Sequence, residues 1–245
     1  MNLNGRLVSV ADVTNSERDQ MFSLMEACYE GMERSVFEDD LREKQWVILL
    51  EDPIHHVVCG FSTQTLLEAD VEGHPTRALF SGDTIVAPEY WARNPLAQVW
   101  GQFALSLIDA DRPTPLYWFL ITKGYKTYRF LPVFFDEFYP RHDRPTPEWA
   151  RCVIDALGRH KYPTGYDREA GIVRAGDSGC RLRSGVAGIT ERRLQDPHVR
   201  FFAEQNPNHT LGDELCCFAP LTRENFTTAA YRVIGAAPAL SDAAP

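Results

Sequence analysis

The sequence has no apolar run that approaches the ~20 residues a helix needs to cross a bilayer. Its first twenty residues also lack a basic start followed by an apolar stretch, which is the pattern of a secretory signal. These absences argue against a membrane partner. We therefore expect a cytoplasmic protein.

Paired cysteines are missing as well. The six cysteines include no C-x-x-C pair, and the adjacent Cys216 and Cys217 would point to opposite faces of a strand. The seven histidines show no metal-binding spacing, because His55 and His56 alternate sides of a predicted strand. These patterns predict buried free thiols and no metal site, and they argue against a zinc enzyme.

A positive net charge is also lacking. The formal net charge of -9 argues against bulk nucleic-acid binding. Residues 1–75 hold 15 acidic and 5 basic side chains, whereas the stretch from Arg112 to Pro132 holds four basic residues and no acidic one. Such a local basic stretch suggests an anionic partner, although a solvated helix face explains it equally well.

Glycine is absent between Gly82 and Gly101, in "SGDTIVAPEYWARNPLAQVWG", which is typical of a strand, a loop and a helix. Asn94 suits the N-cap, and Pro95 suits the first helical position. The free backbone N–H groups of such a helix start can bind a phosphate. Two interpretations stay open: a phosphate site, or an ordinary helix start. The candidate phosphate-binding residues are Arg93, Asn94, Leu96, Ala97 and Gln98.

The predicted elements follow the order β-α-α-β-β-β-α-β-α, and the wholly apolar run "LYWFLIT" is typical of a central strand buried on both faces. Over about Gly5 to Tyr139 this order resembles the GCN5-related N-acetyltransferase (GNAT) superfamily. In that superfamily a strand ending V-x-P leads into a pyrophosphate-binding turn. Here "VAP" begins at Val86, which the resemblance makes a candidate donor-binding residue. The superfamily signature [QR]-x-x-G-x-[GA] is absent in its usual form.

The resemblance implies an α/β (α+β) fold, with a mixed, mostly antiparallel central sheet flanked by helices. Residues 1–140 would form this acyltransferase core. The family pattern ends there, and possible strands at "AGIVR", "GCRLRSGV" and "DELCCFAPL" predict a C-terminal α+β extension over 141–235, packed on the core. Residues 236–245 are typical of a disordered tail.

An acyltransferase of this kind must deprotonate its acceptor and protonate the departing thiolate. Asp83 is the best-placed general base, because it stands alone in an otherwise uncharged strand where burial would raise its pKa. His56 is the alternative base. The resemblance implies Tyr128 as the general acid, and Tyr125 lies on nearly the same helix face. Solvent exposure or core packing would equally explain each of these residues.

The resemblance also implies the substrates. The donor would be acyl-CoA or acyl-phosphopantetheine, with no tightly bound cofactor, and the acceptor an amine or hydroxyl of a small molecule. The missing glycines favour a carrier-bound donor, which presses less closely on the turn. A basic patch of Arg93, Lys123, Lys126 and Arg129 would meet the acidic face of an acyl-carrier protein.

Specialised metabolism would suit a carrier-bound donor. Two alternatives remain: an N-acyl amino acid or acyl-lactone type synthase with a long acyl chain, and a catalytically inactive GNAT-like binding module. Trp91, Trp100 and Trp118 would line an acyl or acceptor pocket, or pack in the core.

Overall fold

A computed structural model of the chain describes residues 3–91, 94–110, 113–176, 181–183 and 188–236. Arg93, one of the predicted phosphate ligands, lies outside these residues, as do residues 237–245 of the predicted tail. Among the described helices none has both the length and the apolar character needed to cross a membrane.

Most strands join one mixed sheet, in the order β1-β3-β4-β5-β6-β10-β8-β7. All its neighbours are antiparallel except β5 and β6, which run parallel. This confirms the predicted mixed, mostly antiparallel sheet. A second, two-stranded sheet pairs β2 with β9. The strand bounds are β1 Asn4–Ser9, β2 Tyr29–Glu30, β3 Trp46–Asp52, β4 Val57–Val71, β5 His74–Val86, β6 Leu116–Thr122, β7 Tyr166–Asp167, β8 Ile172–Val173, β9 Arg181–Leu182 and β10 Glu214–Pro220.

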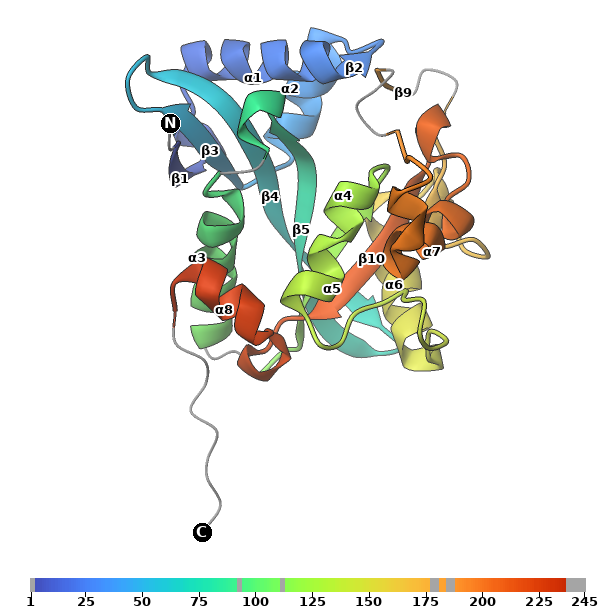
Figure 1. Cartoon of the computed structure of the whole chain (residues 1–245). Coiled ribbons are helices and arrows are strands. Elements are labelled where there is room, and N and C mark those ends of the chain that lie inside the picture. The colour runs from blue at the N-terminus through green and yellow to red at the C-terminus, as the bar shows by residue number, and fades with distance from the viewer. Residues whose placement is uncertain (1–2, 92–93, 111–112, 177–180, 184–187, 237–245) are drawn as a thin grey trace.

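Helices cover both faces of the large sheet (Figure 1). Their bounds are α1 Asn15–Cys28, α2 Arg34–Arg42, α3 Leu96–Asp109, α4 Tyr125–Tyr128, α5 Phe130–Phe134, α6 Glu148–Lys161, α7 Pro197–Gln205 and α8 Thr228–Ile234. Short 3-10 turns lie at Val10–Asp12, Pro88–Tyr90, Arg193–Gln195, His209–Leu211 and Arg223–Asn225. The helix predicted after "LYWFLIT" is therefore two short helices, α4 and α5, that meet at Arg129.

Alternation along the central strands divides the core between the two faces. Leu79 and Trp118 pack with α3, α4, α5, α7 and α8 on one face, which we call the α3 face. Phe80 and Phe119 pack with α6 on the opposite face, the α6 face, where α1 and α2 also lie, against β3, β4 and the end of β5. The adjacent Cys216 and Cys217 point to opposite faces, as their spacing predicts.

The C-terminal part of the chain extends the same sheet. Strand β10 pairs with β6 from Leu215 to Pro220, and β8 and β7 follow at its other edge. Figure 1 shows β10 crossing the molecule beside α4, α5 and α7. The predicted strand at "DELCCFAPL" is confirmed, and the division of the chain at residue 140 stays a prediction.

Candidate functional site

The parallel pair β5–β6 separates midway along the sheet. The two strands are paired from Arg77 opposite Leu116 to Ser81 opposite Leu120, and no pairing continues beyond that point in the described residues. Strand β5 carries an irregularity at the same place: Ser62 pairs with Thr84 and Gln64 with Ser81, so that Gly82 and Asp83 together oppose one residue of β4. Bulges bend a strand and redirect its side chains. The irregularity in β5 begins just after Ser81, where β5 and β6 separate.

A cavity of about 450 Å³ occupies this opening. It is lined from both faces of the sheet, because Ser81 and Trp118 belong to the α3 face, whereas Phe80 belongs to the α6 face. Cavities of a few hundred Å³ are of the size that binds small molecules. Two strands that part also leave backbone N–H and C=O groups on their facing edges, available to a ligand.

A chain of buried hydrogen bonds fixes the floor of the cavity. Trp118 Nε1 donates to Ser81 Oγ at 2.9 Å, and Ser81 Oγ donates to Gln64 Oε1 at 2.7 Å. Gln64 Nε2 donates to Ser62 Oγ at 2.7 Å, and Ser62 Oγ lies 2.7 Å from Thr84 Oγ1. Fully connected polar networks hold a buried region in one arrangement. The floor is therefore already ordered without a ligand.

The end of the cavity on the α6 face is polar, and we call it the polar arm. Its charged and phenolic side chains are Tyr29, Asp40, Lys44, Asp83, Lys123, Tyr162 and Glu214. Lys44 Nζ lies 2.6 Å from Asp40 Oδ1, and Lys123 Nζ lies 3.0 Å from Glu214 Oε1. The Lys44 side chain is only 1% exposed, so its charge needs this partner.

Asp83 differs from the four charged neighbours, because it has no hydrogen bond or ion pair to any described residue. Burial raises the pKa of Asp83 to about 7, and the negative charges of Asp40 and Glu214 add to the rise while Lys44 and Lys123 oppose it. A carboxyl group with a pKa near 7 exchanges protons at neutral pH. The sequence prediction of a raised pKa is confirmed; the catalytic role of Asp83 stays a prediction.

Gly82 makes room for the polar arm. A Cβ at this position would lie 2.7 Å from Thr63 Oγ1 and 2.8 Å from Lys44 Cε. Both distances are too short for a carbon atom, so a larger residue would displace Lys44 or the strand. The glycine therefore allows the buried Lys44 to pass over β5 beside Asp83.

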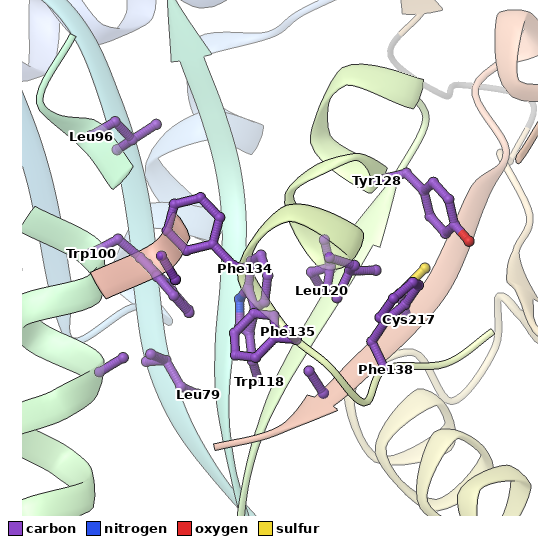
Figure 2. Packing of buried hydrophobic residues seen from close by; sticks show 14 of the residues in the cluster. Leu79, Leu96, Trp100, Trp118, Leu120, Tyr128, Phe134, Phe135, Phe138 and Cys217 are labelled. Carbon is purple, nitrogen blue, oxygen red and sulfur yellow. The ribbon is translucent and has the colours of Figure 1, made fainter. Parts of the chain in front are cut away.

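The opposite end of the cavity is apolar, and we call it the apolar arm. Its walls are three pairs of side chains from α3, β6 and α5: Leu96, Trp100, Trp118, Leu120, Phe130 and Phe134. The Trp100 and Trp118 rings lie 4.4 Å apart between centroids. Figure 2 shows the Phe134 ring extending from α5 toward Leu96 and Trp100 on α3.

Cationic side chains lie near the cavity rim beside α3. Lys126 Nζ lies 3.3 Å from the centre of the Trp91 ring, and Trp91 Nε1 donates to the Val86 carbonyl at 2.7 Å. Partial burial lowers the pKa of Lys126, and the positive charge of Arg193 lowers it further. Neither Lys126 nor Arg193 has a carboxylate partner among the described residues. Predicted ligands Val86 and Lys126 both line the cavity, and Arg193 was not predicted from the sequence.

The start of α3 differs from the prediction. Pro95 takes the N-cap position, and Leu96 is the first helical residue. Asn94 Oδ1 accepts from Leu96 N at 3.2 Å, so this amide is already used. Ala97 lines the cavity, whereas Gln98 is exposed and is not part of the lining. Of the three predicted amides, that of Ala97 has the best position for a ligand.

The two candidate tyrosines occupy different environments. Tyr128 is fully buried, outside the cavity lining, and its hydroxyl donates to the Pro140 carbonyl at 2.9 Å. Its burial raises the pKa of Tyr128 far above the ordinary value. In Figure 2 its ring lies beside Cys217 and Phe138, away from the apolar arm. This position does not suit the predicted general acid, whereas Tyr125, the alternative, lines the cavity.

Two further predicted residues lie away from the cavity. His56 occupies the turn between β3 and β4 with a side chain 79% exposed, and its Nδ1 lies 2.9 Å from Glu51 Oε1. Its left-handed φ of 53° belongs to a turn, not to the strand assumed in the prediction. Arg129 forms an ion pair with Asp196 at 3.1 Å. Lys123 does line the cavity, paired with Glu214 in the polar arm.

Comparisons with known proteins bear on the fold. No family model matches the sequence, and no curated protein matches it. Similar solved structures include a probable N-acyltransferase from Enterococcus faecalis V583, with 16% identity, a TM-score of 0.42, and coverage of 55% of this chain and 33% of that one. A GNAT family N-acetyltransferase from Escherichia coli in complex with CoA has 15% identity and a TM-score of 0.38, with coverage of 52% of this chain and 67% of that one. A GCN5-related N-acetyltransferase from Kribbella flavida has 17% identity and a TM-score of 0.39, with coverage of 56% of this chain and 34% of that one.

The similarity spans about a third of the first and third of these proteins. At these identities and TM-scores it carries no argument about activity, which has to come from the site. The order of elements and the β5–β6 pair that separates beyond Ser81 are nevertheless the chain's own features. They agree with the mixed, mostly antiparallel sheet flanked by helices that the sequence predicts.

Proposed function

We propose that this chain transfers an acyl group from a phosphopantetheine thioester to an amine or hydroxyl of a small molecule. The observation that carries the proposal is the position of Asp83: a carboxyl group with a pKa near 7, inside a cavity that passes between two separated parallel strands. The strands offer free backbone edges to the amide-rich pantetheine arm. The carboxylate faces the place where an acceptor would meet the thioester.

The chemistry needs two proton transfers. Asp83 accepts the proton of the acceptor, and the acceptor's nitrogen or oxygen forms a bond to the thioester carbon. The carbon–sulfur bond breaks, and its electron pair leaves with the sulfur. The Tyr125 hydroxyl then donates a proton to the thiolate and regains one from solvent, while Asp83 releases the acceptor's proton to solvent. Direct attack needs no enzyme nucleophile. Cys216 and Cys217 are buried in the core, and burial raises the pKa of Cys28, which lines the cavity, so this side chain stays a thiol at neutral pH.

The phosphate of the donor would bind near the cavity rim. Lys126 supplies a cation there, with Arg193 near enough for its charge to lower the pKa of Lys126, and the start of α3 adds the Ala97 amide and the positive end of the helix dipole. The predicted patch for a carrier protein is smaller than the sequence suggests, because Lys123 and Arg129 both pair with carboxylates. We propose acyl-CoA and an acyl-carrier protein as the two donors to compare.

A thiol-release assay tests the proposal. Acyl-CoA and acyl-carrier protein, each with a panel of small amines and alcohols, should release thiol in the presence of the wild-type chain, and Asp83→Asn should abolish that release. The matched control is Asp12→Asn, an exposed aspartate outside the cavity. If donors bind but the wild-type chain and Asp83→Asn release thiol at the same background rate, the chain is a binding module instead.

A further inference from the structure

The apolar arm contains one polar atom without a partner. Trp100 Nε1 is buried, and no described residue accepts its hydrogen bond. The other indole of the arm is satisfied, because Trp118 Nε1 donates to Ser81 Oγ. A buried N–H group without an acceptor costs stability, and native proteins rarely keep one without a reason. The Trp100 ring lines the cavity, but Nε1 itself is closed to solvent, so a small movement of the ring would present this N–H to an oxygen of a bound molecule.

The walls of the arm restrict what that molecule can be. Three elements each contribute two apolar side chains at spacings that place both on one face: Leu96 with Trp100, Trp118 with Leu120, and Phe130 with Phe134. Ser81 Oγ is already both donor and acceptor. A pantetheine arm, which brings two amides, would leave most of its polar groups unpaired here. An alkyl or aromatic group with one oxygen at its end would pack against the apolar walls and accept a hydrogen bond from Trp100 Nε1.

The polar arm could not take the same group. It holds Asp83 and two lysine–carboxylate pairs, whose desolvation by an alkyl chain would be unfavourable. The two substrates would therefore be sorted by polarity, with the acceptor in the polar arm and the acyl group in the apolar arm. This step rests on the proposed function.

We infer that the donor carries an apolar acyl group longer than acetyl, bound in the apolar arm, and that Trp100 Nε1 donates a hydrogen bond to its carbonyl oxygen. Trp100 is then a specificity-determining residue. Binding of the acyl group in the apolar arm forms and breaks no covalent bond.

A series of acyl-CoA thioesters, from acetyl to decanoyl, with free CoA as the reference, tests this inference by calorimetry. Affinity should rise roughly three- to fourfold per added methylene until the arm is filled. Equal affinity for free CoA, acetyl-CoA and octanoyl-CoA would overturn the inference while leaving the proposed function intact. Failure of every CoA thioester, of free CoA and of octanoyl-carrier protein to bind would overturn both.

Two substitutions separate the parts of the inference. Trp100→Phe should weaken binding of octanoyl-CoA roughly fivefold and leave binding of free CoA unchanged, because free CoA has no thioester carbonyl oxygen to accept the hydrogen bond. Equal losses for both would show a structural effect instead. Phe130→Ala should move the preferred chain length upward, whereas Phe201→Ala should not. Both phenylalanines are half-buried, but only Phe130 lines the cavity. Thermal unfolding of each variant checks that it is folded.

Discussion

The two arms of the cavity are built from the same strands and have opposite chemistry. On β5 and β6, side chains that point to the α3 face meet Trp100 and Phe134, and those that point to the α6 face meet Lys44 and Tyr162. In the polar arm both lysines are paired with carboxylates, and Asp83 is the charged side chain without an ion pair or hydrogen bond among the described residues. In the apolar arm that group is Trp100 Nε1.

This difference teaches what each unpaired group can do. Asp83 is charged in one protonation state, so burial changes its pKa and makes it able to move a proton near neutral pH. The indole N–H of Trp100 does not titrate, so its burial can only select a ligand that brings an acceptor. Under the proposed function, proton transfer therefore belongs to the polar arm and substrate selection to the apolar arm.

The largest effect should come from removing the carboxylate of the polar arm. Asp83→Asn cannot accept a proton, and we expect turnover to fall by roughly a thousandfold, with donor affinity retained. Single-turnover thiol release and calorimetric titration with acyl-CoA measure the two quantities. A fall in donor affinity equal to the fall in rate would mean that Asp83 binds the donor instead of acting as the base.

The next effect concerns the two tyrosines. Tyr125→Phe should slow turnover about a hundredfold if its hydroxyl protonates the thiolate. Tyr128→Phe should instead lower the free energy of unfolding by about 1 kcal/mol, because the Pro140 carbonyl loses its donor, and leave turnover unchanged. Urea unfolding and thiol release on both variants decide the matter. The reverse pattern would restore Tyr128 as the general acid.

The choice between these tyrosines shows where sequence reasoning stops. Their spacing of three residues allowed both to face the same way. The structure separates them because Tyr128 packs against Phe202 of α7, some seventy residues away in the chain, with ring centroids 5.7 Å apart. No local pattern predicts that contact. The strand, the loop and the approximate start of α3 could be predicted, because alternation, turn residues and helix caps are local signals.

Asp83 could be predicted for the same local reason, because it is the only acidic residue in β5. The groups that adjust its pKa were not found. Lys44 follows α2 and Glu214 begins β10, so their approach to Asp83 depends on the complete sheet. Gly82 was the available signal, since a glycine inside a strand often marks a bulge or a close approach.

A smaller effect should appear in the pH dependence of the rate. Because Asp83 must be ionised to accept a proton, the rate should rise through a midpoint near pH 7 and then level off. Asp40→Asn removes a negative neighbour and should move the midpoint to lower pH. Lys44→Met removes a positive neighbour and should move it to higher pH.

The decisive result is that the pH midpoints of Asp40→Asn and Lys44→Met shift in opposite directions. Below the midpoint, a shift of one pH unit corresponds to about a tenfold change in rate. The pH–rate profiles of the wild-type chain and both variants measure it. Shifts of the same sign in the two variants would show that the substitutions disturb the arm and not the charge on Asp83.

The smallest effect should come from the cations near the rim, because exposed charges contribute little individually. Lys126→Ala and Arg193→Ala should each weaken binding of acyl-CoA about fivefold, and the loss should shrink as salt is raised. Arg232→Ala, an exposed cation outside the cavity lining, is the control. Titrations at low and high ionic strength, with acyl-CoA and with acyl-carrier protein, then compare the two donors.

A carrier protein brings its own surface to the rim. A loss of affinity confined to the carrier-bound donor would therefore assign Lys126 and Arg193 to protein docking. An equal loss of affinity for both donors would assign them to the phosphate that the two donors share.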